Sequence, residues 1–183
     1  MRVPCSELEL AFEVWQSSPR TLVGFMPRTH IRRNDALEYR CWWRVWWDGA
    51  YSIILTKAAI LHHDYFRAYF EVLPKEIFTL VDTRRNCEDI AMQFLIANIS
   101  NIAPIYIKGH LRDLGVFGGI STSANVVTAN HMRERDSCLN DLVKIFDRNP
   151  LIKSHVIVDS ASNGWTNSPS TWFEYLSSDL WKW

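Results

Sequence analysis

Apolar residues recur along this chain with two spacings, one typical of strands and one typical of helices. The predicted strands are short apolar runs between turn residues, at 21–25, 37–47, 50–55, 104–108 and 151–159. The predicted helices carry apolar residues three and four positions apart, at 6–18, 57–72 (one or two helices), 75 onward, 86–97 and 133–146. Strands that alternate with helices in this order indicate an α/β layered domain.

Local signals set the predicted boundaries. Ser6 and Glu9 match a capping box, and Pro19 ends the helix that this box begins. Pro74 is predicted to open another helix. Asp48-Gly49 is predicted to be the turn of a hairpin that joins 37–47 to 50–55. The segment 109–130, with its Gly-Gly pair and small polar residues, is predicted to be a long loop.

Composition bounds the class of protein. With 183 residues the chain is long enough for one domain with a sizeable core. Its net charge is zero, which argues against nucleic acid or an anionic membrane as the main partner. No apolar run reaches the ~18 residues that a membrane-spanning helix needs. A sequon at Asn98 would accept an N-glycan in a secretory lumen, although such triplets also occur by chance.

The helix at 86–97 carries a polar stripe on an otherwise apolar surface. Asn86, Asp89 and Gln93 lie at helical spacing and share this stripe, with apolar residues on both sides. A carboxyl group with apolar flanks is partly desolvated, which tends to raise its pKa and suits it to work as a base or hydrogen-bond partner. The alternative is that Asp89 caps or pairs structurally, which is the commoner role for such a residue.

Two cysteines, Cys87 and Cys138, lie near the N-terminal ends of predicted helices. A disulfide between them would close a loop of about 50 residues, worth about 4 kcal/mol on the chain-entropy model. It would also bring Arg135 close to Asp89, and an arginine beside two helix N-termini could bind the diphosphate of a leaving group. The alternative is two free buried thiols, with Arg135 on a solvated helix face.

Two further groups could carry binding chemistry. In a strand, the four tryptophans at 42, 43, 46 and 47 would form two pairs on opposite faces, one in the core and one free to stack on a sugar ring. His62-His63-Asp64 could suggest a metal site. Adjacent residues do not face one way on a helix, so these three are predicted to be ordinary surface residues. Glu7 and Glu9 are predicted to be first-turn acids of a helix rather than metal ligands.

Several of these segments together resemble the exostosin-type glycosyltransferase family 64 domain, and most of all its plant members. The resemblance covers about residues 6–158. The segments that carry it are 12–16, 22–28, the tryptophan-rich stretch before Tyr51-Ser52, Asn86 to Met92, and Arg135-x-x-Cys138-x-Asn140-x-Leu142-Val143.

The resemblance implies a GT-A fold and retaining transfer of an N-acetylhexosamine from UDP to a glycan or glycolipid hydroxyl, assisted by Mn²⁺. It implies that Asp89 is the catalytic acidic residue and that Arg135 contacts the donor diphosphate. Asn86 and Glu88 match neighbouring substrate-binding positions, and Cys87 and Cys138 match a disulfide. Family members act in the lumen of the Golgi or endoplasmic reticulum, usually behind an N-terminal membrane anchor.

The chain departs from the family in one respect, because it contains no Asp-x-Asp motif. Residues 1–159 are therefore expected to be the C-terminal portion of the domain, N-terminally truncated, with 160–183 as a polar, tryptophan-containing tail. No residue of this chain is assigned as a Mn²⁺ ligand, and membrane association is expected only through segments outside it. Two alternatives stay open, a non-catalytic glycan-binding module or pseudoenzyme and a subdomain that does not fold alone.

Overall fold

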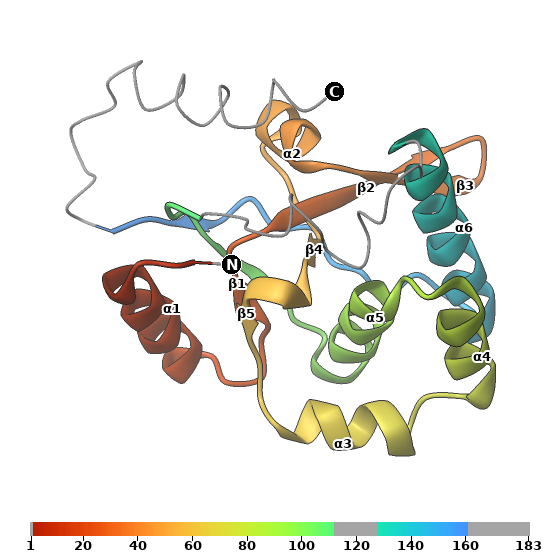
Figure 1. Ribbon diagram of the computed structural model, residues 1–183, viewed down its shortest axis with the longest axis horizontal. Coiled ribbons are helices and arrows are strands. Elements are labelled where there is room, and N and C mark those ends of the chain that lie inside the picture. Colours follow the sequence, from red (N-terminus) through yellow and green to blue (C-terminus); the bar gives the residue numbers. More distant parts are fainter. Residues whose placement is uncertain (1, 112–127, 161–183) are drawn as a thin grey trace.

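The computed structural model describes residues 2–111 and 128–160, and Figure 1 shows their arrangement. The elements follow one another as α1 (Cys5–Ser17), β1 (Val23–Gly24), β2 (Pro27–Arg33), β3 (Ala36–Arg40), α2 (Trp42–Asp48), β4 (Ile53–Ile54), the 3₁₀ turn η1 (Thr56–Ala58), β5 (Ala59–Ile60), α3 (Asp64–Glu71), α4 (Lys75–Arg84), α5 (Glu88–Ser100), β6 (Ile105–Ile107), α6 (Thr128–Phe146) and β7 (Ile157–Val158). The predicted mixed α/β class is confirmed. The predicted tail lies, from residue 161 onward, outside the described residues.

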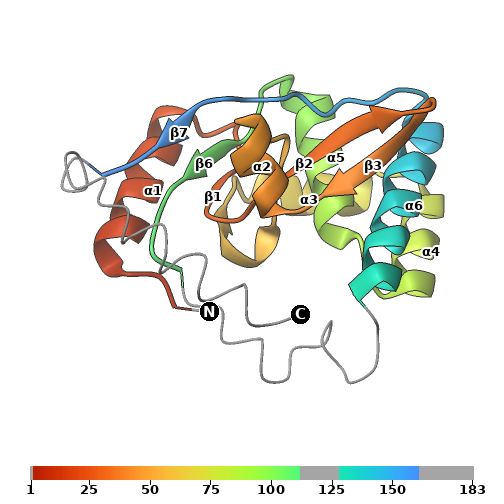
Figure 2. The same ribbon diagram turned by 90° about the horizontal axis from the view of Figure 1, so that it is seen from above.

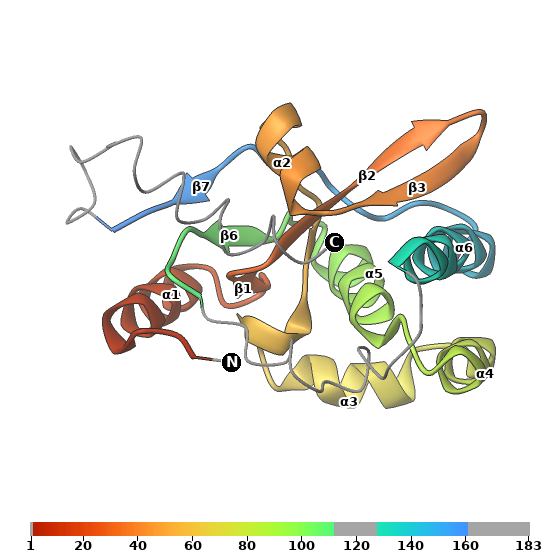
Figure 3. The same cartoon turned by 45° about the horizontal axis from the view of Figure 1, so that its top comes forward.

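The strands form two small sheets. In the first, with the order β5-β1-β6-β7, the strands β1, β6 and β7 run parallel and β5 is antiparallel to β1. The second is antiparallel, with the order β3-β2-β4. Helix α1 lies on one side of the molecule, and α4, α5 and α6 lie together on the other (Figures 1, 2 and 3). The described residues contain no helix that is both long and apolar enough to cross a membrane.

The hairpin lies elsewhere than predicted. Its strands are β2 and β3, and its turn is Asn34-Asp35, where both residues have positive φ (47° and 62°), as a type I′ turn requires. Strand β2 was not predicted because it is rich in charged residues rather than apolar ones. Strand β4 pairs with β2, so the hairpin predicted for 37–47 and 50–55 is wrong.

The tryptophan-rich segment is helix α2, so its prediction as a strand is also wrong. Aromatic residues favour strands, but this preference depends on burial against neighbours. Here Val45 is the buried residue of the helix, and Trp43, Trp46 and Trp47 are exposed by 44%, 58% and 72%. Gly49, in the left-handed region at φ 61°, ends α2, so the Asp-Gly pair serves as a helix stop rather than a hairpin turn.

Helix α1 begins at Cys5 with Pro4 as its N-cap and no side-chain cap, so the capping box predicted for Ser6 and Glu9 is wrong. The predicted starts of two other helices can be compared with the structure. Pro74 is the N-cap of α4, as predicted. Helix α6 begins at residue 128, within the loop predicted for 109–130, and the part of that loop at 112–127 lies outside the described residues.

The larger core surrounds α5, which is buried from Asp89 to Ala97. It is lined by Leu22, just before β1, by Ile53 and Ile54 of β4, and by Leu139 and Leu142 of α6. A smaller core between α1 and the first sheet contains Ala11, Val23, Phe25 and Ile107. Because α5 is enclosed on all sides, polar side chains on its first turn lie at the edge of a dry interior.

Candidate active site

Asp89 and Arg135 form a buried ion pair between the first turn of α5 and helix α6. The Arg135 Nη1 lies 3.0 Å from Asp89 Oδ2 and 3.3 Å from Oδ1. The side chains are exposed by only 6% for Asp89 and 10% for Arg135. Removing one partner of such a pair strongly destabilises the fold, because the other partner is then a buried charge without a counter-ion. The sequence placed both residues at this site, and the structure brings them together.

A disulfide joins Cys87 to Cys138, with the two Cα atoms 6.3 Å apart. Cys87 is the N-cap of α5 and has a positive φ of 78°. Cys138 lies one turn along α6 from Arg135, so the bridge fixes the start of α5 beside the helix that carries the arginine. The disulfide and the approach of Arg135 to Asp89 are as predicted.

Arg84, at the end of α4, holds the same part of α6. Its Nη2 lies 2.6 Å from Asp141 Oδ2 and 3.1 Å from Ser137 Oγ, and its Nη1 lies 3.1 Å from Cys138 Sγ. These donors and the Lys144 ammonium hold the pKa of Asp141 below its usual value, against the opposing effect of burial. Arg84 was not identified from the sequence, although a basic residue in the last turn of a helix is a recognisable signal.

Helix α6 also binds the free edge of β3 through side chains. Asp136 Oδ1 accepts the Tyr39 N–H at 2.6 Å. Asn140 accepts the Leu37 N–H at 2.8 Å and donates to the Leu37 carbonyl at 2.7 Å, as a neighbouring strand would. Burial raises the pKa of Asp136, and the bond from Tyr39 N–H partly offsets this rise. The outward-facing backbone groups of Leu37 and the Tyr39 N–H therefore have hydrogen-bond partners. These bonds also hold Tyr39 close to Arg135.

Tyr39 is a neighbour of the ion pair that the sequence analysis did not identify. Arg135 Nη1 donates to its hydroxyl oxygen at 3.2 Å. Burial raises the pKa of Tyr39, only partly countered by the positive charges of Arg28 and Arg135, so the phenol stays neutral. Burial alone would lower the pKa of Arg135, but Tyr39 and Asp89 together raise it above its ordinary value. The site therefore holds a permanent guanidinium cation between a carboxylate and a phenol.

The other predicted site residues lie close by in different settings. Asn86 is buried just before α5, and its side-chain oxygen accepts the Cys87 N–H at 2.8 Å. Glu88 is exposed on the first turn of α5, next to Asp89. Gln93 belongs to a structural contact, because its Oε1 accepts the Ile54 N–H of β4 at 3.2 Å. Of the predicted polar stripe, Asp89 and Gln93 are within the helix, and Asn86 precedes it.

The carboxylates near Asp89 do not form a site for Mn²⁺. This ion prefers several oxygen ligands at once. Asp89 is bound to Arg135, and among the described residues the only acidic and histidine side chains grouped closely enough to hold an ion are His62, His63 and Asp64. No chemical step at Asp89 is therefore assigned to a metal held by these residues.

Glu7 is a first-turn acid of α1, as predicted, and it also makes a contact that the sequence did not indicate. It is buried, and its carboxylate accepts the His110 N–H at 2.8 and 2.9 Å and contacts His110 Nδ1 at 2.9 Å. Gly109 packs against this carboxylate so closely that a Cβ there would lie 2.4 Å from Glu7 Oε2. Glu7 thus fixes the chain at the end of β6 to helix α1.

Comparison with known proteins matches the sequence of this chain to one family. The glycosyl transferase family 64 domain matches residues 1–165. Glycosylinositol phosphorylceramide mannosyl transferase 1 of Arabidopsis thaliana is 39% identical over 167 residues, covering 88% of this chain and 48% of the relative. Exostosin-1 of Bos taurus is 34% identical over 156 residues, and Exostosin-1b of Danio rerio 32%, each covering 84% of this chain.

The chain belongs to glycosyl transferase family 64, as the sequence resemblance predicted. It is a glycosyltransferase by family, and its relatives include exostosins and a plant mannosyl transferase. It spans about half the length of the plant relative and about a fifth of Bos taurus exostosin-1.

Proposed function

We propose that this chain is the C-terminal portion, residues 1–159, of a GT-A-type domain that catalyses retaining glycosyl transfer, followed by a tail at 160–183. The donor is a UDP-linked N-acetylhexosamine and the acceptor a hydroxyl of a glycan or glycolipid. The observation that carries this proposal is the buried ion pair of Asp89 and Arg135, clamped by the Cys87–Cys138 disulfide.

The pair suits the charges that develop during transfer. The bond between the sugar C1 and the diphosphate oxygen breaks, a bond from C1 to the acceptor oxygen forms, and the acceptor hydroxyl passes its proton to the leaving diphosphate. Positive charge grows on the sugar ring and negative charge on the leaving diphosphate. A buried carboxylate, Asp89, stabilises the first charge, and the guanidinium of Arg135 stabilises the second with directed N–H donors. Asn86 and Glu88 flank the pair as substrate-binding residues.

The relatives and the disulfide support the proposed acceptor class and cellular setting. The plant relative is named for a glycosylinositol phosphorylceramide, which makes a glycolipid the acceptor we favour. Its name also makes mannose the alternative donor sugar. A disulfide between buried cysteines fits an oxidising lumen, such as that of the Golgi or endoplasmic reticulum. Mn²⁺ binding and membrane anchoring are proposed to depend on segments outside this chain.

One observation favours a second candidate, a glycan-binding module without catalysis. Trp43, Trp46 and Trp47 are exposed on α2, and indole rings commonly stack on sugar rings. Such a module would bind saccharides but not the nucleotide. Titration of tryptophan fluorescence with a saccharide and separately with UDP and Mn²⁺ distinguishes the two, since the transferase must respond to the nucleotide.

The experiment that tests the transferase proposal compares sugar transfer by the full-length protein with transfer by its Asp89→Asn variant. Losing the carboxylate charge should lower the transfer rate by roughly 10²–10³-fold while donor binding persists. Glu13→Gln, an exposed acid on α1, is the matched control and should leave transfer unchanged. Unreduced turnover by the Asp89→Asn variant would refute the catalytic role.

A further inference from the structure

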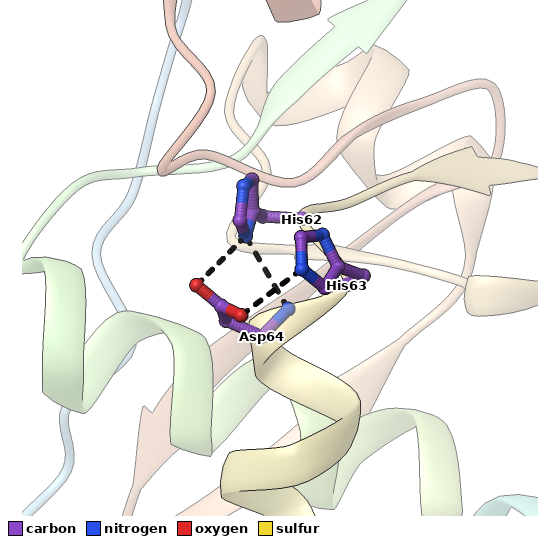
Figure 4. A group of neighbouring side chains, drawn as sticks. All are labelled: His62, His63 and Asp64. Carbon is purple, nitrogen blue, oxygen red and sulfur yellow. Dashed lines mark hydrogen bonds and ion pairs between the residues drawn. The ribbon is translucent and has the colours of Figure 1, made fainter.

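Three potential metal ligands converge at the start of α3, on a different segment from Asp89 (Figure 4). His62 Nδ1 lies 3.3 Å from one carboxylate oxygen of Asp64, and His63 Nε2 lies 3.2 Å from the other. The ligand atoms of all three residues lie within 4.8 Å of one another. Two imidazoles therefore face one carboxylate from two sides.

The local backbone explains why three consecutive residues can converge. The sequence analysis placed them on a helix, where neighbouring side chains diverge. In the structure only Asp64 belongs to α3, His63 is its N-cap and His62 precedes it. Backbone bonds from Tyr65 N–H to His62 O (3.1 Å) and from Phe66 N–H to His63 O (3.0 Å) hold the segment as a tight turn. The predicted surface location is confirmed for His63 and Asp64, which are both exposed.

The ring of His62 is held in place before any ligand arrives. It stacks on Trp15 of α1 with ring centroids 6.2 Å apart and planes 25° apart, and it contacts the tilted ring of His63 at 4.4 Å. Tyr65, the next residue of α3, is anchored by its hydroxyl to the Arg20 carbonyl at 2.7 Å. A site whose ligands are already oriented loses less entropy on binding.

The two nitrogen–oxygen separations are close to those between ligands of a small ion. Zn²⁺ binds imidazole nitrogen and carboxylate oxygen at about 2.0–2.1 Å, so two ligands of a tetrahedral ion lie about 3.3–3.4 Å apart. The observed 3.2 and 3.3 Å agree with this spacing. In addition, His62 Nδ1 lies 3.3 Å from the Asp64 backbone N–H, a contact that needs the nitrogen lone pair. Nδ1 has a single lone pair, so an ion bound there would replace this long contact.

We infer that His62, His63 and Asp64 bind one late first-row divalent ion such as Zn²⁺, with water in the remaining positions. Two imidazoles with one carboxylate favour Zn²⁺, Ni²⁺ and Cu²⁺ over Mg²⁺ or Mn²⁺, which prefer oxygen ligands. The ion would tie the turn after β5 to the first residue of α3. The inference does not depend on the proposed function, because none of the three residues takes part in it.

The test is isothermal titration of the untagged 183-residue chain with ZnCl₂ alone. Thiolates are Zn²⁺ ligands, so the titration uses a Cys5→Ser/Cys41→Ser background that removes the two free cysteines. We expect saturable binding of one ion per chain, weakened about tenfold or more by His63→Ala and by Asp64→Asn. Both positions are exposed, so these variants should keep the circular dichroism spectrum of the parent.

His155→Ala provides the matched control, because His155 is an exposed histidine bound to the Gly49 carbonyl at 2.9 Å. It should leave the affinity unchanged. Titration with MnCl₂ should show much weaker binding than with ZnCl₂. The inference is overturned if the parent shows no saturable Zn²⁺ binding, or if His63→Ala and Asp64→Asn bind as tightly as the His155→Ala control.

Discussion

Tyr39 on β3 and Arg135 on α6 are joined in two ways, although 96 residues separate them. The Arg135 Nη1 donates to the Tyr39 hydroxyl at 3.2 Å, and the guanidinium carbon also lies 5.0 Å from the centroid of the Tyr39 ring. The phenol therefore holds the guanidinium on one side while Asp89 binds it on the other. Arg135 is oriented by the fold rather than free to move.

Tyr39→Phe should separate these two contacts. It removes the hydroxyl acceptor but keeps the ring beneath the guanidinium, so we expect a loss of about 1–3 kcal/mol of unfolding free energy. Tyr39→Ala should cost more, because it also removes the ring and leaves a cavity. Urea unfolding followed by circular dichroism measures both. Equal losses for the two variants would mean that the ring contact contributes nothing.

Removing the disulfide should destabilise the whole chain. The bridge spans 51 residues, and a Cys87→Ser/Cys138→Ser variant should lose about 4 kcal/mol, measured by guanidinium unfolding. The Cys5→Ser/Cys41→Ser variant is the control, since neither thiol is bonded, and it should unfold like the parent. If mass spectrometry without reduction found four free thiols in the parent, the pairing would be wrong.

His30 makes the chain sensitive to acid. Burial, with a smaller effect of Lys153, lowers the pKa of His30 to about 4 from its ordinary 6.5. Asn149 donates to its Nε2 at 3.1 Å, so its Nδ1 carries the proton and donates to Ser52 Oγ at 2.7 Å. Between these two pKa values the unfolded chain binds the extra proton and the folded chain does not. The contribution of His30 to stability is therefore present above pH 6.5 and is lost as the pH falls toward 4, by roughly 3 kcal/mol at most.

The measurement is the unfolding free energy of the parent and of His30→Gln at several pH values from 7.5 to 4.5. Carboxyl groups titrate in the same range in both proteins, so the difference between them isolates His30. We expect the parent to lose its advantage over the variant as the pH falls. A difference that stays constant with pH would show that His30 does not titrate in this way.

The side chain of Asn140 should stabilise the edge of β3 by hydrogen bonding to the backbone of Leu37. Asn140→Ala leaves the N–H and carbonyl of Leu37 without their side-chain partner, at an expected cost of about 1–3 kcal/mol. Hydrogen exchange of the Leu37 amide should speed up more than that of amides within α5. Glu134→Ala, an exposed residue of the same helix, is the control. Unchanged exchange at Leu37 would show that the side chain does not cap this strand.

Helix α5 and the main residues of the candidate site could be predicted from the sequence, because the signals for them lie in short segments of the chain. Helix α5 has a long apolar run, and its acid, together with the disulfide and Arg135, was identified through neighbouring motifs. Helix α2 was mistaken for a strand because its tryptophans favour strands and its closing Asp-Gly pair also marks hairpins. The bonds of Tyr39 and Leu37 to α6 join residues about 100 positions apart, and no pattern in the chain marks such contacts.

The most direct test of the central claim is the affinity of the full-length protein for UDP in the parent, Arg135→Gln and Asp89→Asn forms, measured by isothermal titration. If Arg135 binds the donor diphosphate, Arg135→Gln should weaken UDP binding by about tenfold or more, equivalent to a loss of about 1.4 kcal/mol. Asp89→Asn should bind UDP at least as tightly as the parent, because it frees the guanidinium from its carboxylate partner. Equal UDP affinity in the parent and a folded Arg135→Gln variant would contradict the account.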